Sequence, residues 1–384
     1  MRLLLLTTEF PPGPGGIGTH AFQVARQLTR LGWDITVFAA QDYAAEDEIA
    51  AFNAAQPFRV IRWASQRGTL ANFADRWRLV NSHLRGWQPD AALASGSRSV
   101  WLMSGLAARH PGLRWAAVGH GTEFQLARWW ERALTRWAFR RADAVICVSE
   151  FTRRRMRQAG IQPRVEVVIP NGADPGLFKV LPGECVAHVK EQLGLQGAHL
   201  LVTVGNVTQR KGQDIVIRAL PEILKQAPNT HYLIVGLPTL QQAYEALARE
   251  LGVAEHVRFL SRVDAKTLVE VLNAADVFVM TSRHTETGDF EGYGIAVVEA
   301  ALCGKPAVVS DNSGLVEAVG VGRTGLAVPQ DDPAATARAV LVLLTDPGKR
   351  ARMGEAARAR ALSEQTWEMR AAEYDRVLRG IVAT

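Results

Sequence analysis

Short apolar runs alternate with longer amphipathic stretches along almost the whole chain, and this alternation limits the possible folds more than any other feature. Such runs are typical of strands buried in a parallel sheet, and the stretches between them predict covering helices. The first half contains predicted strands at residues 3–7, 35–39, 58–63, 91–94, 115–118, 144–148 and 165–169. The second half contains predicted strands at 200–204, 232–236, 257–260, 277–280 and 307–310. The sequence therefore predicts an α/β fold.

The length of 384 residues exceeds what one typical core needs and fits two domains. We expect a first Rossmann-like domain over residues 1–180 and a second over 190–365, with a linker rich in Gly and Pro near their junction. Residues 366–384 contain a predicted amphipathic helix. The apolar residues spaced for one face of this helix are Trp367, Met369, Tyr374 and Val377.

The cysteine content and the lengths of the apolar runs indicate the cellular compartment of the protein. The three cysteines are scattered and form no CxxC pair, so the sequence predicts neither a zinc site nor a disulfide framework and fits a reducing cytoplasm. The apolar run at the start is only four residues long, which predicts a strand and not a signal peptide. No apolar stretch approaches the roughly 20 residues that span a bilayer. We therefore expect a soluble or surface-bound protein.

Residues 286–305, ETGDFEGYGIAVVEAALCGK, carry the clearest functional pattern. Glu291 precedes an aromatic turn bounded by glycines, and a predicted helix then carries Glu299 and ends at Gly304. The first backbone amides of a helix lack partners within it and can bind anions, and here they belong to Tyr293, Gly294 and Ile295. Carboxylates for hydroxyl groups and free amides for phosphate predict a nucleotide-sugar site.

The spacing of the two glutamates argues against glycoside hydrolysis. A retaining glycosidase holds its two carboxyl groups about 5 Å apart. Eight residues of helix, the separation of Glu291 and Glu299, rise by about 12 Å. The pair therefore fits two contacts along one extended ligand.

A second glycine-rich segment, GGIG at residues 15–18, follows the first predicted strand and opens a helix. Glycines let a ligand approach the backbone, and a helix N-terminus favours phosphate. A dinucleotide site is the alternative, but the loop has three prolines and no convincing acidic residue follows the second strand. Gly16 is the predicted ligand contact.

The chain resembles the retaining glycosyltransferases of family 4 nearly from end to end. Besides the two-glutamate motif, the resemblance is carried by TTEFPPGPGGIGTH (7–20), AVGHGTEF (117–124), VICVSEFTRRRM (145–156), IPNGAD (169–174), VGNVTQRKGQD (204–214) and SDNSGLVEAV (310–319). It implies the GT-B fold, in which two Rossmann-like domains face each other across a cleft and the last helix crosses back onto the first domain. The EGYGI version of the glutamate motif is most similar to mannosyltransferases that act on lipid-linked or phosphoinositide acceptors.

The resemblance also implies roles for individual residues. The catalytic residues would be His120, which contacts the donor sugar and orients the acceptor, and Glu291, which binds hydroxyls of the transferred sugar. Glu299 would hold the ribose diol. The first domain would bind the acceptor and the second the nucleotide-sugar. The implied donor contacts are Gly16, Arg210, Lys211, Val263, Tyr293, Gly294, Ile295 and Glu299.

No cofactor or metal is implied, because Arg210 and Lys211 would neutralise the departing diphosphate. The nucleotide-sugar is a substrate, with GDP-mannose favoured and a UDP-hexose as the alternative. One position departs from the family pattern, since Asn206 stands where Arg usually follows the glycine of the strand. That diphosphate contact is either missing or supplied by Arg210, whose guanidinium can bind bidentately.

The first half of the chain is basic, with 23 Lys and Arg against 14 Asp and Glu in residues 1–180, whereas the remainder has a net charge of −3. Arginine and large aromatic residues gather at 126–141 and 151–157. Two interpretations stay open: a buried helix with a solvated basic face, or adsorption to anionic lipid with Trp at the headgroup level. Nucleic acid is not expected as a partner, since no recognised binding fold is present. The apolar residues expected to share one helical face are Leu126, Trp130, Leu134, Trp137 and Ala138.

These observations predict a metal-independent, retaining hexosyltransferase in the cytoplasm, peripheral on the inner face of the cell membrane. It would move mannose from GDP-mannose to a hydroxyl of a lipid-linked or glycan acceptor in envelope polysaccharide or glycolipid synthesis. Two other functions use the same fold: a sugar-nucleotide epimerase, which needs no acceptor, and a degenerate nucleotide-sugar-binding subunit.

Overall fold

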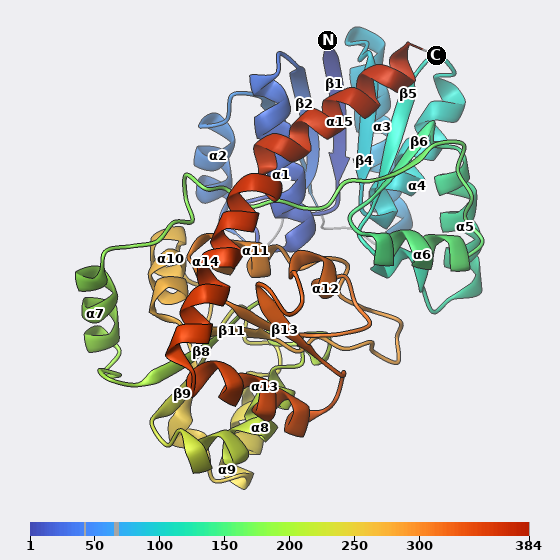
Figure 1. Cartoon of the computed structure of the whole chain (residues 1–384). Helices are drawn as coiled ribbons and strands as arrows, with labels where there is room; N and C mark the ends of the chain where they lie inside the picture. The colour runs from blue at the N-terminus through green and yellow to red at the C-terminus, as the bar shows by residue number, and fades with distance from the viewer. Residues whose placement is uncertain (42–43, 65–68, 384) are drawn as a thin grey trace. The chain divides into compact units, whose positions relative to one another are not determined.

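The computed structural model describes residues 1–41, 44–64 and 69–383, and the chain divides into two compact units. The first unit contains Met1–Asn171 together with Trp367–Thr384, and the second contains Gly172–Thr366. Each unit is built on one parallel sheet with helices packed against it (Figure 1). The predicted α/β fold with two Rossmann-like units is confirmed.

The first unit has a parallel sheet in the order β3-β2-β1-β4-β5-β6-β7. The chain builds outward from β1 in one direction and then returns to add β4 on the other side, so the strand order reverses between these two strands. Ligands of open parallel sheets bind at the carboxyl ends of the strands near such a reversal. The strands are β1 (Arg2–Thr7), β2 (Asp34–Gln41), β3 (Arg59–Ala64), β4 (Ala91–Ser95), β5 (Arg114–Gly119), β6 (Ala144–Cys147) and β7 (Glu166–Val168). The helices before residue 171 are α1 (Gly16–Arg30), α2 (Glu46–Ala54), α3 (Thr69–Gly86), α4 (Ser97–Arg109), α5 (Trp129–Arg140) and α6 (Glu150–Gln158).

The second unit has a parallel sheet in the order β10-β9-β8-β11-β12-β13, with the reversal between β8 and β11. Its strands are β8 (His199–Val204), β9 (Thr230–Val235), β10 (Val257–Phe259), β11 (Val277–Met280), β12 (Ala307–Ser310) and β13 (Gly325–Val328). Its helices are α7 (Gly183–Gln192), α8 (Gln213–Gln226), α9 (Gln241–Glu250), α10 (Ala265–Ala274), α11 (Ile295–Leu302), α12 (Leu315–Ala318), α13 (Pro333–Leu344) and α14 (Pro347–Glu364).

The predicted strands are all present, and one strand was not predicted. β13 has the sequence GLAV, in which only three apolar residues stand between a glycine and a proline, so the sequence does not distinguish it from a loop. Its register opposite β12 fixes the glycine, because a Cβ on Gly325 would lie 2.3 Å from the carbonyl oxygen of Ala307.

The last helix, α15 (Trp367–Val382), belongs to the first unit and packs beside α1 (Figure 1). Asp375 on this helix accepts a hydrogen bond from Trp33 Nε1 at 2.7 Å. The predicted return of the C-terminal helix to the first domain is confirmed. The predicted apolar face is partly wrong, because Met369 is exposed. The buried stripe runs through Trp367, Ala371, Tyr374, Leu378 and Ile381 at the i, i+4, i+7 spacing of one helix face.

The helices begin in two different ways. Side chains cap several of them, for example Ser149, which accepts from Thr152 N at 2.9 Å, and Asp264, which accepts from Thr267 N at 2.7 Å. In contrast, α1 and α11 follow Gly15 and Gly294 and have no side-chain cap. The residue before each of these two helices is therefore a glycine, which offers no capping side chain. In the described part of the chain, no helix is both long and apolar enough to cross a bilayer.

Candidate nucleotide-sugar site

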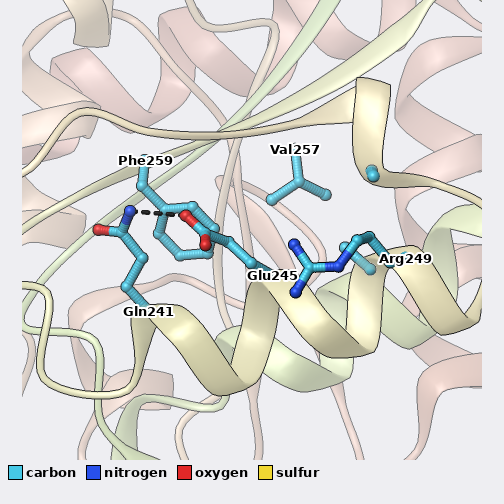
Figure 2. A pocket seen from close by; sticks show the side chains of 7 residues that line it. Gln241, Glu245, Arg249, Val257 and Phe259 are labelled. Atoms are coloured by element: carbon cyan, nitrogen blue, oxygen red, sulfur yellow. Dashed lines mark hydrogen bonds between the residues drawn. The ribbon is translucent and has the colours of Figure 1, made fainter.

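A pocket of about 270 Å³ lies at the edge of the second sheet, between α9 and β10 (Figure 2). Gln241 Nε2 donates to Glu245 Oε1 at 2.7 Å on its wall. The lining residues are Gln241, Glu245, Ala248, Arg249, Ala254, Val257 and Phe259. None of the predicted donor contacts is among them, so this pocket is separate from the predicted site.

The predicted cations Arg210 and Lys211 occupy a short 3-10 turn between β8 and α8. Contacts to the end of β11 hold the backbone of this turn. Thr281 Oγ1 donates to the carbonyl of Gly212 at 2.7 Å, and Arg283 N donates to the carbonyl of Arg210 at 2.8 Å. The turn therefore lies at the reversal of strand order in the second sheet.

Glu291 closes a charged triad with Arg210 and Lys211. Lys211 Nζ donates to Glu291 Oε2 at 2.7 Å, and Arg210 donates to the same oxygen. Burial favours the neutral acid, but the two cations and their hydrogen bonds outweigh it and lower the pKa of Glu291 to about 2. Burial also lowers the pKa of Lys211, an effect that Glu291 opposes. The structure thus brings Glu291 against two adjacent cations that lie 80 and 81 positions earlier in the chain, in another motif.

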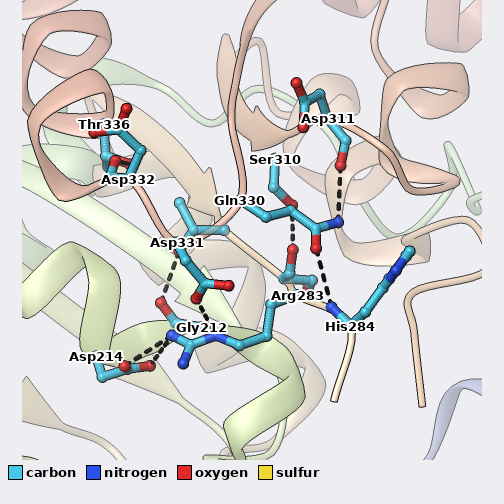
Figure 3. Close-up of polar contacts among 12 residues, drawn as sticks. Gly212, Asp214, Arg283, His284, Ser310, Asp311, Gln330, Asp331, Asp332 and Thr336 are labelled. Carbon is cyan, nitrogen blue, oxygen red and sulfur yellow. Dashed lines mark hydrogen bonds and ion pairs between the residues drawn. The ribbon is translucent and has the colours of Figure 1, made fainter. Parts of the chain in front are cut away.

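A charged clasp, formed by Arg283, Asp214 and Asp331, lies at the same end of the sheet as the triad (Figure 3). Arg283 donates to both carboxylate oxygens of Asp214, at 2.6 and 2.7 Å, and pairs with Asp331 at 2.9 Å. Gln330 Oε1 accepts from the backbone of His284 at 3.0 Å. Because the backbone of Arg283 holds Arg210, the clasp fixes the cationic turn. Sequence analysis missed it, since its members are scattered and only their position after predicted strands could have pointed to it.

The turn between Glu291 and α11 is held by close contacts with the next loop. Gly294 has φ +94°, and a Cβ there would lie 2.4 Å from Leu315 Cδ2. Gly314 N donates to the carbonyl of Glu291 at 3.0 Å. Tyr293 is buried, and its hydroxyl accepts from Gln365 Nε2 at 3.1 Å. The side chain of Tyr293 therefore belongs to the core and is not a ligand contact. Ile295 is the first residue of α11.

Glu299 lies on α11, as predicted, in a very different environment from Glu291. Burial raises its pKa to about 7. In residues 1–41, 44–64 and 69–383, no hydrogen bond or ion pair to its carboxyl group is present. This carboxyl group is thus partly buried and available to a ligand.

Two further predicted positions in the second unit have local roles. Val263 is half-buried in the segment before α10, next to the capping residue Asp264. Asn206 Oδ1 accepts from the backbone of Leu237 at 3.3 Å, so this amide holds the loop after β9. The position that usually carries Arg in the family is therefore used here for loop structure.

His120 and Gly16 lie in the first unit, after β5 and β1. His120 Nε2 is hydrogen-bonded to Ser95 Oγ at 2.8 Å, and burial lowers the pKa of His120 to about 4. The buried carboxylate of Glu123 accepts from the backbone N–H groups of His120 and Gly121, at 3.0 and 2.6 Å. The imidazole is therefore neutral near pH 7, on a loop that Glu123 holds rigidly.

Gly16 is the first residue of α1, and the fold itself does not explain why it is glycine. A Cβ on Gly16 would meet no atom within 4 Å, whereas a Cβ on Gly18 would lie 3.0 Å from Phe10 N. Open space in front of an uncapped helix is what ligand approach to the backbone requires. In the described residues, no group of three His, Cys, Asp or Glu side chains is placed to hold a metal.

The basic segment of the first unit does not have the predicted buried face. Trp129, Trp130 and Trp137 on α5 are 74%, 42% and 46% exposed. The buried residues of α5 are Thr135, Ala138 and Phe139. Of the five residues expected to share a face, Ala138 is buried, whereas Trp130 and Trp137 are exposed, so the open interpretation as a buried helix does not hold for the tryptophans. The helix is anchored by Phe139, whose ring centroid lies 5.1 Å from that of Phe124, and by the hydrogen bond from Trp101 Nε1 to Thr135 Oγ1 at 3.0 Å.

The two parallel-sheet units, each with one reversal of strand order, give the chain the GT-B fold. Two solved structures share the fold over nearly the whole chain. Anabaena Alr3699/HepE in complex with UDP and glucose gives a TM-score of 0.84 at 21% identity, covering 99% of this chain and 100% of that one. Sucrose-phosphate synthase from Thermosynechococcus elongatus gives 0.82 at 22% identity, covering 100% and 99%.

Sequence comparison gives the family. Residues 14–177 match the family described as Glycosyltransferase Family 4, and residues 188–360 match Glycosyl transferases group 1. The GDP-mannose-dependent alpha-(1-6)-phosphatidylinositol monomannoside mannosyltransferase of Mycolicibacterium smegmatis is 34% identical over 98% of both chains. The GDP-mannose-dependent monoacylated alpha-(1-6)-phosphatidylinositol monomannoside mannosyltransferase of Corynebacterium glutamicum is 29% identical over 98% of both. The chain belongs to the glycosyltransferases of family 4, and the predicted resemblance is confirmed.

Proposed function

We propose that this enzyme is a retaining mannosyltransferase that uses GDP-mannose and a mannosylated inositol glycolipid as acceptor. The observation that carries the proposal is the charged triad of Arg210, Lys211 and Glu291 in the second unit. Two cations and one ionised carboxylate at the end of a parallel sheet suit a diphosphate joined to a sugar. The names of the relatives in M. smegmatis and C. glutamicum support mannose and the glycolipid acceptor.

The donor would be held by groups of the second unit. Arg210 and Lys211 would bind the diphosphate together with the uncapped start of α11, and Glu291 would accept hydrogen bonds from hydroxyls of the mannose. Glu299, whose carboxyl group has no protein partner in the described residues, would accept from the ribose diol. Val263 would contact the base. The backbone donors at the start of α11 are those of Tyr293, Gly294 and Ile295.

Transfer with retention would proceed on one face of the sugar. The bond between the anomeric carbon and the diphosphate oxygen breaks, and the acceptor oxygen forms its bond on the same side. The departing diphosphate takes the acceptor proton, while Arg210 and Lys211 stabilise its growing charge. His120 is neutral because its pKa is about 4, so it would orient the acceptor by hydrogen bonding and not act as a cation. Gly16 would let the ligand approach the start of α1.

The experiment supplies purified enzyme with GDP-mannose or UDP-glucose and with vesicles containing phosphatidylinositol monomannoside. We expect transfer of mannose from GDP-mannose, with an α linkage in the product by NMR, and full activity in excess EDTA because Arg210 and Lys211 supply the positive charge. A β linkage would exclude retention, and a loss that magnesium reverses would exclude metal independence. Consumption of the donor without acceptor would favour the epimerase.

We also propose that the first unit docks on anionic membrane through α5. Exposed tryptophans on a helix with arginine are typical of a surface that enters the headgroup region. Trp129 and Trp137 carry this proposal, because both are exposed and Arg141 lies over the ring of Trp137 at 5.3 Å. Arginines of α6 are less suitable for a test, since Arg153 pairs with Glu150 at 2.6 Å and Arg157 pairs with Glu166.

The membrane proposal is tested by co-sedimentation with phosphatidylglycerol vesicles at low and high salt. Trp129→Gln with Trp137→Gln should reduce binding at least about tenfold, while the matched control Val321→Gln, an exposed apolar residue of the second unit, should bind as the wild type does. Wild-type protein that stays in the supernatant at low salt would show that the tryptophans serve another partner.

A further inference from the structure

Two histidines from different elements of the first unit meet ring to ring. His20 lies on α1 and His120 follows β5, and their ring centroids are 4.8 Å apart with the planes at 83°. His20 is fully buried, and burial together with His120 keeps its pKa well below the usual range. A neutral imidazole therefore stands edge-on against the histidine that we place in the reaction.

The C-terminal helix reaches this pair of rings. Tyr374 on α15 is buried, and its hydroxyl is hydrogen-bonded to His20 Nε2 at 2.8 Å. Trp367, the first residue of α15, lies edge-on to the same ring with centroids 5.8 Å apart. The side chains of α15 thus determine how the His20 ring is held.

Stability does not explain this arrangement. The second ring nitrogen of His20, Nδ1, is buried and has no hydrogen-bond partner among the residues that the structure describes. A buried polar atom without a partner destabilises a fold, whereas an apolar pair of the same shape in place of His20 and Tyr374 would be nearly neutral or stabilising. A polar pair at this position points to a role in the site.

We propose that His20 and Tyr374 are positioning residues that set the orientation of the His120 ring. This inference rests on the proposed function, because it takes His120 as the group that orients the acceptor. Ser95 Oγ holds only Nε2 of His120, and in the described residues no hydrogen bond to Nδ1 is present. The His20 ring packs against His120 at 83° and limits rotation of His120 about its anchored nitrogen, so Nδ1 keeps one direction. Small errors of orientation are costly in a reaction that depends on alignment.

The test compares variants that change two different contacts of α15, one with His20 and one with Trp33. Tyr374→Phe removes one hydroxyl, and the double variant His20→Leu with Tyr374→Phe removes both polar partners. Asp375→Ala is the matched control, because it removes the hydrogen bond from Trp33 to the same helix without touching His20. Melting temperature, affinity for GDP, and kcat and KM for mannose transfer to the glycolipid are measured for each protein.

We expect Tyr374→Phe and the double variant each to lower kcat at least about tenfold. Their affinity for GDP should stay unchanged, because the proposed GDP contacts near Arg210 and Lys211 are intact. The double variant should keep the wild-type melting temperature. Asp375→Ala should lower the melting temperature and keep kcat within about twofold. If the double variant has wild-type kcat, or if Asp375→Ala lowers kcat equally, the positioning role is refuted and the proposed function stands. If wild-type enzyme transfers no sugar, or His120→Asn has wild-type kcat, the underlying assignment fails instead.

Discussion

Glu291 and Glu299 are close in sequence, yet the first has a pKa of about 2 and the second a pKa of about 7. Both carboxyl groups are partly withdrawn from water, which raises a carboxyl pKa. Glu291 has Arg210 and Lys211 against it, whereas Glu299 has no ionic partner in the described residues. One carboxylate is therefore always charged, and the other changes charge near neutral pH.

The titration of Glu299 predicts pH-dependent donor binding. A carboxylate accepts hydrogen bonds from both ribose hydroxyls, so binding needs the ionised form, which dominates above about pH 7. Affinity for GDP-mannose should fall about fivefold between pH 7 and about pH 6, as the ionised fraction of Glu299 falls. Calorimetry measures this, since the diphosphate diester of GDP-mannose does not titrate there and the His120 pKa of about 4 lies below the range. Glu299→Gln should bind weakly and without this pH dependence; an equal pH dependence in the variant would assign it to another group.

Loss of the negative charge of Glu291 should slow transfer but should not weaken binding of the product GDP. Glu291→Gln keeps the size of the side chain and removes the anion that pairs with Arg210 and Lys211. Transfer should fall at least about 100-fold, because hydroxyls of the sugar lose their charged acceptor. GDP should bind as tightly as to wild type or more tightly, because both cations are free for phosphate. Glu245→Gln, in the separate pocket, is the control and should leave both quantities unchanged; weaker GDP binding in Glu291→Gln would refute this account.

The sequence allowed the residues of the site to be predicted more readily than the residues that they contact. The sequence placed Glu291 before a helix and Glu299 on it, and both placements are confirmed. The ion pairs of Glu291 with Arg210 and Lys211 were not foreseen, because contacts across some 80 residues leave no local pattern. The same limit explains Asn206, whose amide contact with Leu237 depends on the loop after β9.

At the scale of the element, Gly16 at the start of α1 and Gly294 just before α11 differ in what surrounds them. Gly16→Ala adds a methyl group in open space at the start of α1 and should stabilise the protein by about 0.4–1 kcal/mol while lowering transfer, because ligand approach is obstructed. Gly294→Ala adds a methyl group against Leu315 at positive φ and should destabilise the second unit. Thermal unfolding and initial rates separate the two effects. Full activity of Gly16→Ala would remove Gly16 from the site.

Strands could be predicted from runs of apolar residues because both faces of a parallel sheet are buried. That rule found strands as short as β10, but it failed for GLAV of β13. Helical spacing likewise groups Trp130 and Trp137 on one face of α5, but these side chains are 42% and 46% exposed. Spacing identifies residues that share a face, and only tertiary packing decides which face is covered.

At the scale of the whole molecule, the proposed contacts of one donor are divided between the units. Hydrogen exchange can therefore locate binding without a crystal. GDP-mannose should slow exchange at 209–213 and 292–299 in the second unit, and at 13–20 in the first, because Gly16 is a proposed contact. Exchange over α5 should not change. Protection confined to the second unit would show that the loop before α1 does not meet the donor.

The first unit is made of both ends of the described chain, with the second unit inserted between Asn171 and Trp367. Domains generally fold in the order of their synthesis, from the N-terminus. Here residues of α1 and of the segment before β2 are made long before the helix that they contact, since His20 and Trp33 have hydrogen-bond partners on α15. The inserted second unit can be complete first. A nascent chain stalled before residue 367 would therefore hold a folded second unit and an N-terminal unit whose contact surface for α15 is exposed. We expect chaperones to bind the nascent chain most strongly in that interval.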